Sequence, residues 1–179
     1  MPLKDGREGV RQVSARMDTV ELHPIGFVHS PVKEPGHEDW QDVVSEIAVS
    51  PEFEPALEHV EDFSHLIVIY WMHLLAPAER GVLRVHPMRS PSLPFAGVFA
   101  ARSPARPNPL GLTVVRLLER RGSVVRVAGL DAVDGTPVLD IKPYLPISDA
   151  ASDVRVASWV HGRHLPAGRG TRRSPLRHP

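Results

Sequence analysis

Hydrophobic and polar residues alternate with a period of two along much of the chain between residues 25 and 141. This alternation is typical of β-strands with one buried face, and a run of apolar residues is typical of a strand buried on both faces. The residues from His65 to Met72 form such a run, so we expect a central strand buried on both faces there. Together the patterns predict short strands over residues 25–29, 43–49, 65–72, 97–100, 112–118, 124–130 and 137–141.

Helical signals are few. A helix-start signal, Ser-Pro-Glu at residues 50–52, is followed by apolar residues spaced on one face, which predicts a short helix ending near Asp62. A terminal helix is predicted over residues 149–160. The Arg-Arg-Gly-Ser sequence at residues 120–123 separates two alternating stretches and predicts a hairpin turn. We therefore expect a mostly β fold, an antiparallel sheet or barrel of about seven short strands with a few short helices.

The two ends of the chain differ from its middle. Residues 1–20 mix charged residues with no apolar block, so we expect a flexible N-terminal extension and not a secretory signal. Residues 161–179 contain arginines and glycines without an acid, so we expect a basic, disordered C-terminal tail. One domain is expected over residues 21–160. No stretch approaches the roughly 20 apolar residues of a membrane helix, so no membrane partner is expected.

Composition excludes several kinds of chemistry. The 179 residues include no cysteine, which excludes disulfides, zinc–thiolate centres and cysteine nucleophiles. The ten histidines show no convincing metal-ligand spacing, so no metal is expected. The chain contains no Walker A, Gly-x-Ser-x-Gly or His-Glu-x-x-His sequence, and its only Gly-x-Gly lies in the C-terminal tail.

The net charge of zero hides a segregation of charge along the chain. Ten acids and no Lys or Arg lie between Glu34 and Asp62, whereas nine arginines and two acids lie between Glu79 and Arg126. One interpretation is that the two segments pair with each other, within a subunit or across a dimer. The other is that some arginines bind an anionic ligand, because guanidinium groups suit phosphate and carboxylate.

Two stretches carry most of the candidate chemistry. Residues 102–111 form a loop that three prolines make stiff and that holds two arginines, a serine and an asparagine, either for a ligand or as a surface crossover. Carboxylates can accept hydrogen bonds from ribose hydroxyls or act as bases, but they also serve in turns and structural ion pairs. The second stretch, residues 130–144, contains three carboxylates, a lysine and a tyrosine: Asp131, Asp134, Asp140, Lys142 and Tyr144.

The first stretch also resembles a known signature. Residues 97–111, Gly-Val-Phe-Ala-Ala-Arg-Ser-Pro-Ala-Arg-Pro-Asn-Pro-Leu-Gly, are similar to the Gly-Val-Phe-Ala-Thr-Arg-Ser-Pro-x-Arg-Pro-Asn-Pro-Ile-Gly signature of the TrmO (TsaA-like) family. Residues 130–144 resemble the second signature of that family, and shorter matches occur at residues 63–66 and 25–33. The resemblance covers roughly residues 24–146.

Membership of this family would imply a fold and an activity. The family consists of S-adenosylmethionine-dependent methyltransferases that methylate N6 of N6-threonylcarbamoyladenosine, next to the anticodon of tRNA. Their fold is a single-sheeted β-barrel, and they work as homodimers in the cytoplasm. The resemblance therefore implies S-adenosylmethionine as cofactor, tRNA and a second copy as partners, and a cytoplasmic location.

The resemblance also implies roles for individual residues. Catalytic positions would be Asp134, Lys142 and Tyr144. Substrate would be bound by Lys33, Arg106 and Asn108. Positions that match the cofactor site of the family are His73, Arg102, Leu112, Leu130 and Asp131.

The chain departs from the family pattern in ways that concern the substrate. Residues 34–40 form an acidic loop where longer members carry a Pro-Arg-Gln segment that touches cofactor. Because the chain ends soon after Tyr144, we expect it to lack their C-terminal subdomain. We expect cofactor binding to survive these changes better than substrate identity does. Two alternatives therefore stay open: a methyltransferase of the same fold acting on a small molecule, and a non-catalytic RNA-binding module.

Overall fold

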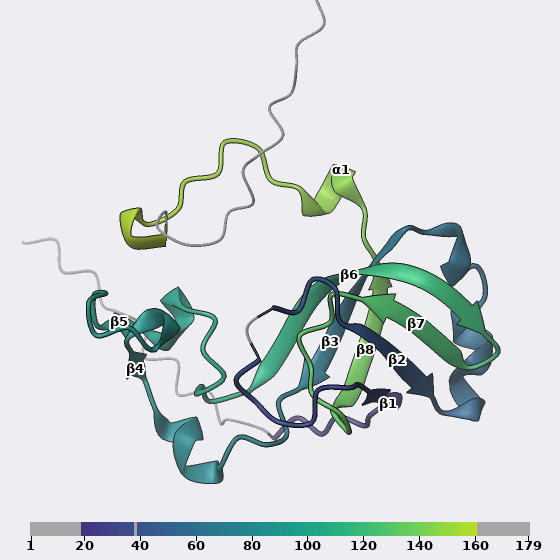
Figure 1. The fold of residues 1–179 in the computed structure, drawn as a ribbon, viewed down its shortest axis with the longest axis horizontal. Coiled ribbons are helices and arrows are strands. Elements are labelled where there is room, and N and C mark those ends of the chain that lie inside the picture. Colours follow the sequence, from purple (N-terminus) through teal and green to yellow (C-terminus); the bar gives the residue numbers. More distant parts are fainter. Residues whose placement is uncertain (1–18, 38, 161–179) are drawn as a thin grey trace, which may run out of the picture.

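A computed structural model describes residues 19–160 except residue 38. Six of its strands form one closed barrel in the order β1-β2-β7-β6-β3-β8, and every neighbouring pair is antiparallel (Figure 1). The expected mostly β barrel is thus confirmed, with a somewhat different number of strands. The barrel strands are β1 (Gly26–His29), β2 (Val44–Val49), β3 (His65–Trp71), β6 (Leu110–Arg121), β7 (Val124–Ala128) and β8 (Pro137–Pro143).

The long strand β6 allows the sheet to close. Its first half pairs with β3, and its second half pairs with β7 after a shift of register between Leu117 and Glu119. Such irregularities bend a strand, and bending is what turns a sheet into a barrel. The predicted hairpin follows, with Gly122 and Ser123 between β6 and β7; Gly122 has φ +57°, a left-handed conformation that glycine adopts without strain.

The barrel interior is the hydrophobic core. Side chains alternate along each strand, so every second residue points inward. Most of the inward residues are β-branched, which suits a pleated, crowded surface. The fully buried ones include Val28, Ile47, Leu66, Val68, Val115, Val125, Val127, Leu130 and Val138.

The expectation for residues 65–72 is wrong in one respect. The inward residues of β3 are buried, but the outward ones, among them Ile67 and Ile69, are only partly so. The outward residues of the neighbouring strand β6, Leu112 and Val114, are exposed. A single sheet that closes on itself covers only its inner face, and no second layer of the described residues covers the outer face of β3.

The predicted helix after residue 50 forms as two 3₁₀-helices, η1 (Pro51–Leu57) and η2 (Val60–Asp62). Pro55 lies inside η1, and His59 between them has φ 66°. Proline cannot donate the hydrogen bond that a continuous helix needs, and a residue in the left-handed conformation ends a right-handed helix. The apolar spacing therefore indicated a helical region, but not its kind or its break.

Residues 97–100 do not form the predicted strand. Only Ala96–Gly97 is extended, as β5, which pairs with β4 (Arg84–Val85) in a small sheet apart from the barrel (Figure 1). The chain then turns as 3₁₀-helix η5 (Val98–Ala100), because no further strand is available there to pair with it. Two more 3₁₀-helices, η3 (Pro77–Gly81) and η4 (Pro87–Arg89), complete this arm between β3 and β6.

The predicted terminal helix over residues 149–160 is also wrong. Only α1 (Pro146–Asp149) and the 3₁₀-helix η6 (Ser158–Val160) are helical. Asp149 accepts a hydrogen bond from the Leu145 N–H at 2.7 Å, which holds the first turn, and Asp153 with φ 55° interrupts any continuation. Ser, Asp and Val residues in this stretch have weak helix propensity.

Parts of the acidic and arginine-rich segments meet, as the pairing interpretation predicts. Arg126 on β7 lies opposite Glu46 on one side and Glu119 on the other. Arg120 also approaches Glu61, with 3.5 Å between Nη1 and Oε1. Such surface ion pairs contribute little to stability. Glu61 occupies Arg120, whereas the strand register places Arg126 beside two acids.

Two expectations fall partly or wholly outside this description, and a third is not tested by it. The N-terminal extension over residues 1–20 is described only from residue 19, and the C-terminal tail over residues 161–179 lies outside the described residues. The limits of the domain at residues 21–160 stay a prediction. Within the described residues, no helix is long and apolar enough to cross a membrane.

Gly111 provides a test of the barrel packing. A Cβ atom at this position would overlap the ring of the buried Tyr70 on the neighbouring strand β3. We expect Gly111→Ala to lower the free energy of unfolding by about 1–3 kcal/mol, because overpacking forces side chains off their rotamers. Chemical denaturation measures the change. In the matched control Gly81→Ala the new Cβ meets nothing within 4 Å, and equal losses in both variants would contradict the packing argument.

Candidate functional site

One end of the barrel collects most of the predicted site residues. Because neighbouring strands are antiparallel, β1, β3 and β7 finish at the end where β2, β6 and β8 begin. We call this the Asp131 end. The predicted residues that lie just after or near these strand termini are Lys33, His73, Leu112, Leu130, Asp131 and Asp134.

Asp131 is held by two hydroxyl groups from the barrel. Tyr70 on β3 donates to Asp131 Oδ1 at 2.7 Å, and Thr113 on β6 also donates to Oδ1. The Tyr70 hydroxyl lies 3.2 Å from the Asp131 carbonyl oxygen as well. Burial first, and then the adjacent carboxylate, raise the pKa of Tyr70 well above its usual value, so the phenol stays protonated and remains a donor.

Asp134 forms a second polar cluster at the same end. Its Oδ2 lies 2.8 Å from Lys33 Nζ, and its Oδ1 accepts the Ser30 N–H at 2.9 Å. His29 Nδ1 is 4.0 Å from Oδ1. The hydrogen bond from Lys33, followed by that from Ser30, lowers the pKa of Asp134 below its usual value. The carboxylate is therefore ionised at neutral pH and is a weak base.

His73 leaves β3 at this end with a buried ring nitrogen. No described residue forms a hydrogen bond with His73 Nδ1. The adjacent Met72 N–H donates to Pro109 O at 2.8 Å, which ties the end of β3 to the start of β6. A buried polar atom without a partner costs free energy unless a bound group satisfies it.

The two predicted leucines lie in opposite environments. Leu130 is fully buried in the core, so only its backbone can reach a ligand. Leu112 is 57% exposed on the outer surface of β6, where its side chain is free to contact an apolar part of a ligand. Both roles stay predictions.

The two arginines of residues 102–111, which we call the signature loop, make different contacts. Arg106 turns back on its own loop: Nε donates to Ser103 O at 2.8 Å, and Nη2 donates to Ala101 O at 2.6 Å and Val98 O at 3.2 Å. Arg102 is exposed, and its guanidinium pairs with no described residue. Asn108 is exposed too, and its main-chain carbonyl accepts the Leu110 N–H. Of the two arginines, Arg102 is thus the one left free for a ligand.

Lys142 and Tyr144 lie at the other end of the barrel. Lys142 pairs in register with Ile67, and the Tyr144 N–H donates to His65 O, whereas Tyr70 pairs with Val138. At ~3.3 Å per residue, this places them roughly 13–20 Å along β8 from the level of Tyr70. Lys142 Nζ also lies 2.7 Å from Asp140 Oδ2, so the two form the structural ion pair that the sequence allowed as an alternative to a catalytic role. One subunit therefore does not bring all three predicted catalytic residues together.

The acidic loop borders the Asp131 end. The Trp40 indole donates to His37 O at 2.9 Å and the two rings meet edge to face, which gives the loop a local structure. The Val43 N–H donates to Trp40 O, and the Val43 carbonyl accepts the Gly129 N–H. The loop is thus tied to the segment that leads directly into Asp131.

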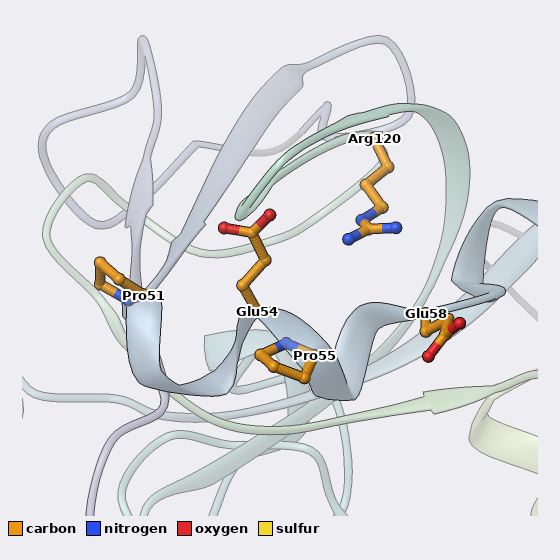
Figure 2. A pocket seen from close by; sticks show the side chains of 5 residues that line it. All are labelled: Pro51, Glu54, Pro55, Glu58 and Arg120. Atoms are coloured by element: carbon orange, nitrogen blue, oxygen red, sulfur yellow. The ribbon is translucent and has the colours of Figure 1, made fainter.

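A polar hollow of about 490 Å³ lies elsewhere on the barrel (Figure 2). It is lined by Glu54 from η1, by Glu58 directly after η1 and by Arg120 from β6, and Glu54 and Arg120 extend toward the same space. Gly122, in the turn at the far end of β6, lies next to Glu54. The hollow is therefore at the opposite end from Asp131, and none of the predicted site residues lines it.

Comparison with known proteins settles the family. The family model described as the tRNA-methyltransferase O N-terminal domain matches residues 29–150. The chain belongs to the TrmO family. The structure of the TrmO protein from Pseudomonas aeruginosa superposes with a TM-score of 0.65 at 31% identity, covering 81% of this chain and 63% of that one.

Curated TrmO relatives carry names that refer to a cofactor or a reaction. A probable S-adenosyl-L-methionine-binding protein of Pyrococcus abyssi is 46% identical over 142 residues, which are 76% of this chain and 74% of the relative. A protein of Escherichia coli named tRNA (adenine(37)-N6)-methyltransferase is 34% identical over 164 residues, which are 84% of this chain and 67% of the relative.

Sequence reasoning missed three residues that shape the Asp131 end. Tyr70 lies within the apolar run of β3, Thr113 lies in the predicted strand over 112–118, and Ser30 falls in the family match over residues 25–33 without a role of its own. The alternation of β3 places Tyr70 inside the barrel, and a buried tyrosine needs a partner for its hydroxyl. That requirement was the available signal, but it did not identify Asp131 as the partner.

The bracing role of Arg106 can be tested by amide exchange. We expect Arg106→Gln to speed amide hydrogen exchange in residues 98–106 about tenfold, because hydrogen bonds from a charged donor to three carbonyls are lost. The matched control is Arg102→Gln, which removes a guanidinium from the same loop and should leave exchange unchanged. Equal acceleration in both variants would show that Arg106 does not brace the loop.

The Asp134 cluster predicts a pH dependence of stability. A carboxylate whose pKa is lowered by folding stabilises the native state above its unfolded pKa of about 3.8 and loses that effect as pH falls through the folded value. The loss of melting temperature caused by Asp134→Asn should therefore be present at pH 6 and shrink at pH 3. Calorimetry at both pH values measures it, and a constant difference would contradict the assignment.

Proposed function

We propose that this protein is an S-adenosylmethionine-dependent methyltransferase that methylates N6 of N6-threonylcarbamoyladenosine, next to the anticodon of tRNA. The observation that carries the proposal is the gathering of His73, Leu112, Leu130 and Asp131 at one end of the barrel. These positions match the cofactor site of the family, and three parts of the barrel supply them: the segment after β3, the start of β6 and the segment after β7. The names of the relatives support the same cofactor and reaction class.

The residues at the Asp131 end fit this cofactor. The buried Nδ1 of His73 has no partner among the described residues, and the Asp131 carboxylate is exposed and can accept from ribose hydroxyls or an ammonium group. Arg102 offers a guanidinium without a partner in the described structure for the carboxylate of a methionine moiety. When bound, S-adenosylmethionine supplies an electrophilic methyl group.

The protein's own contribution to such a transfer is mainly positioning. An in-line displacement needs the nucleophilic nitrogen held close to the methyl carbon, which rigid strand ends can do. Asp134, kept ionised by Lys33, suits anchoring of a donor group better than removal of a proton, because a lowered pKa makes it a weak base. Lys33 and Asn108 would meet the substrate from the β1 and β6 sides of this end.

A homodimer is part of the proposal. Lys142 and Tyr144 lie at the opposite end of the barrel from Asp131, so within one subunit they are far from Asp134. For all three to act on one substrate, Lys142 and Tyr144 have to come from a second copy. The exposed apolar residues on the outer surface of β6, Leu110, Leu112 and Val114, favour the association of the barrel with another surface.

A second candidate is a methyltransferase of the same fold with another substrate. It is favoured by the acidic loop, where Glu34 and Asp39 are exposed close to the segment that leads into Asp131. Negative charge there opposes an RNA phosphate backbone, whereas it would not oppose a neutral or cationic small molecule.

A labelling assay separates these functions. The protein is incubated with S-adenosylmethionine carrying a labelled methyl group and with tRNA that has or lacks threonylcarbamoyladenosine. We expect label only on the modified tRNA, and we expect Arg102→Ala to weaken cofactor binding in calorimetry by about tenfold, because a charged hydrogen-bonding partner is lost.

Arg155→Ala serves as the control, because Arg155 is exposed and belongs to neither signature. It should leave labelling and binding unchanged. Cofactor binding without label on either tRNA would favour the second candidate. A salt-sensitive tRNA complex without cofactor binding would contradict both and would indicate an RNA-binding module.

A further inference from the structure

The hydroxyl of Tyr70 lies inside the barrel at the Asp131 end. Tyr70 is 4% exposed, and its ring packs where Gly111 leaves room on the neighbouring strand β6. A side chain at residue 111 would occupy the same space, so the glycine and the tyrosine form one packed unit. This packing fixes the direction of the phenol, which points at the segment following β7.

Two hydroxyl groups meet one oxygen of Asp131. Tyr70 donates to Oδ1 at 2.7 Å, Thr113 donates to the same atom, and the two hydroxyl oxygens are 3.4 Å apart. These bonds occupy Oδ1 and set the rotation of the carboxylate. No described residue donates to Asp131 Oδ2, and the Asp131 side chain is exposed.

We infer that Tyr70, together with Thr113, is a positioning residue that presents Oδ2 of Asp131 to the hydrogen-bond donors of the bound cofactor. This inference rests on the proposed function for the identity of the ligand. A carboxylate on a loop has several rotamers, and holding one of them before binding lowers the ordering cost that the ligand would otherwise meet. Tyr70 acts through Asp131 and is not expected to touch the cofactor.

The chain makes the hydrogen bond accessible to spectroscopy. Tyr70 and Tyr144 are its only tyrosines, so Tyr144→Phe leaves one tyrosine signal. In the protein labelled with ¹³C at tyrosine Cζ, we expect Asp131→Asn to shift the Tyr70 resonance. Asp134→Asn, which alters a carboxylate at the same end that is not bonded to Tyr70, should leave it in place. An unmoved resonance in Asp131→Asn would contradict the hydrogen bond and the inference with it.

Binding measurements then test the positioning role. We expect Tyr70→Phe to raise the Kd for S-adenosylmethionine about tenfold in calorimetry, since it removes a hydrogen bond to a charged group while keeping the ring. In an Asp131→Ala background the same change should have no further effect. The control Ser45→Ala removes a buried hydroxyl of β2 that has no partner in the described structure, and it should leave Kd unchanged.

The outcomes separate the two proposals. A tenfold loss that disappears without Asp131 supports the positioning role, which a merely structural tyrosine would not reproduce. An equal loss in both backgrounds, or no loss in either, overturns the positioning role while the proposed cofactor stands. If the unaltered protein does not bind S-adenosylmethionine, the proposed cofactor and the positioning role are both contradicted.

Discussion

Closure of the barrel is the constraint on which the other features depend. An open antiparallel sheet leaves unpaired N–H and C=O groups along its two edges, and pairing between β1 and β8 removes both. Closure also determines which strand ends meet. Segments that follow β1, β3 and β7 are brought beside the starts of β6 and β8, and the candidate site consists of these segments. Its residues are distant in sequence because the barrel, and not a local motif, brings them together.

The alternation of side chains predicted the strands more reliably than their arrangement. It identified β1, β2 and β7 nearly to the residue, since a period of two reports which face of a strand is buried. It could not report which strand lies next to which, because strand order depends on pairing across the whole chain. Residues 97–100 show the same limit: their composition suits a strand, but beyond Gly97 no partner strand is available. The helix predicted over residues 149–160 does not form, because its helical pattern is weak and no packing against the barrel supports it.

The sequence could predict the parts of the candidate site that depend on residue type, but not those that depend on which side chains contact each other in the fold. The signature resemblance pointed to His73 and Asp131, which the fold places at one end. It assigned Arg102 to the cofactor and Arg106 to the substrate, and it did not indicate that Arg106 donates to carbonyls of its own loop. The contact of Tyr70 with the site could not be predicted either. A tyrosine inside an apolar run is interpreted as a core residue until the partner of its hydroxyl is known.

The self-contained bracing of the signature loop has a consequence for how the family can vary. Arg106 ties residues 98–103 together through main-chain carbonyls alone, without help from the side chains of the arm that precedes it. The arm from β3 to β5 lies apart from the barrel and packs few residues into its core (Figure 1). Insertions and deletions in the arm are therefore compatible with an unchanged loop, so the arm is a segment through which related proteins can diverge in partner recognition while keeping one scaffold for chemistry.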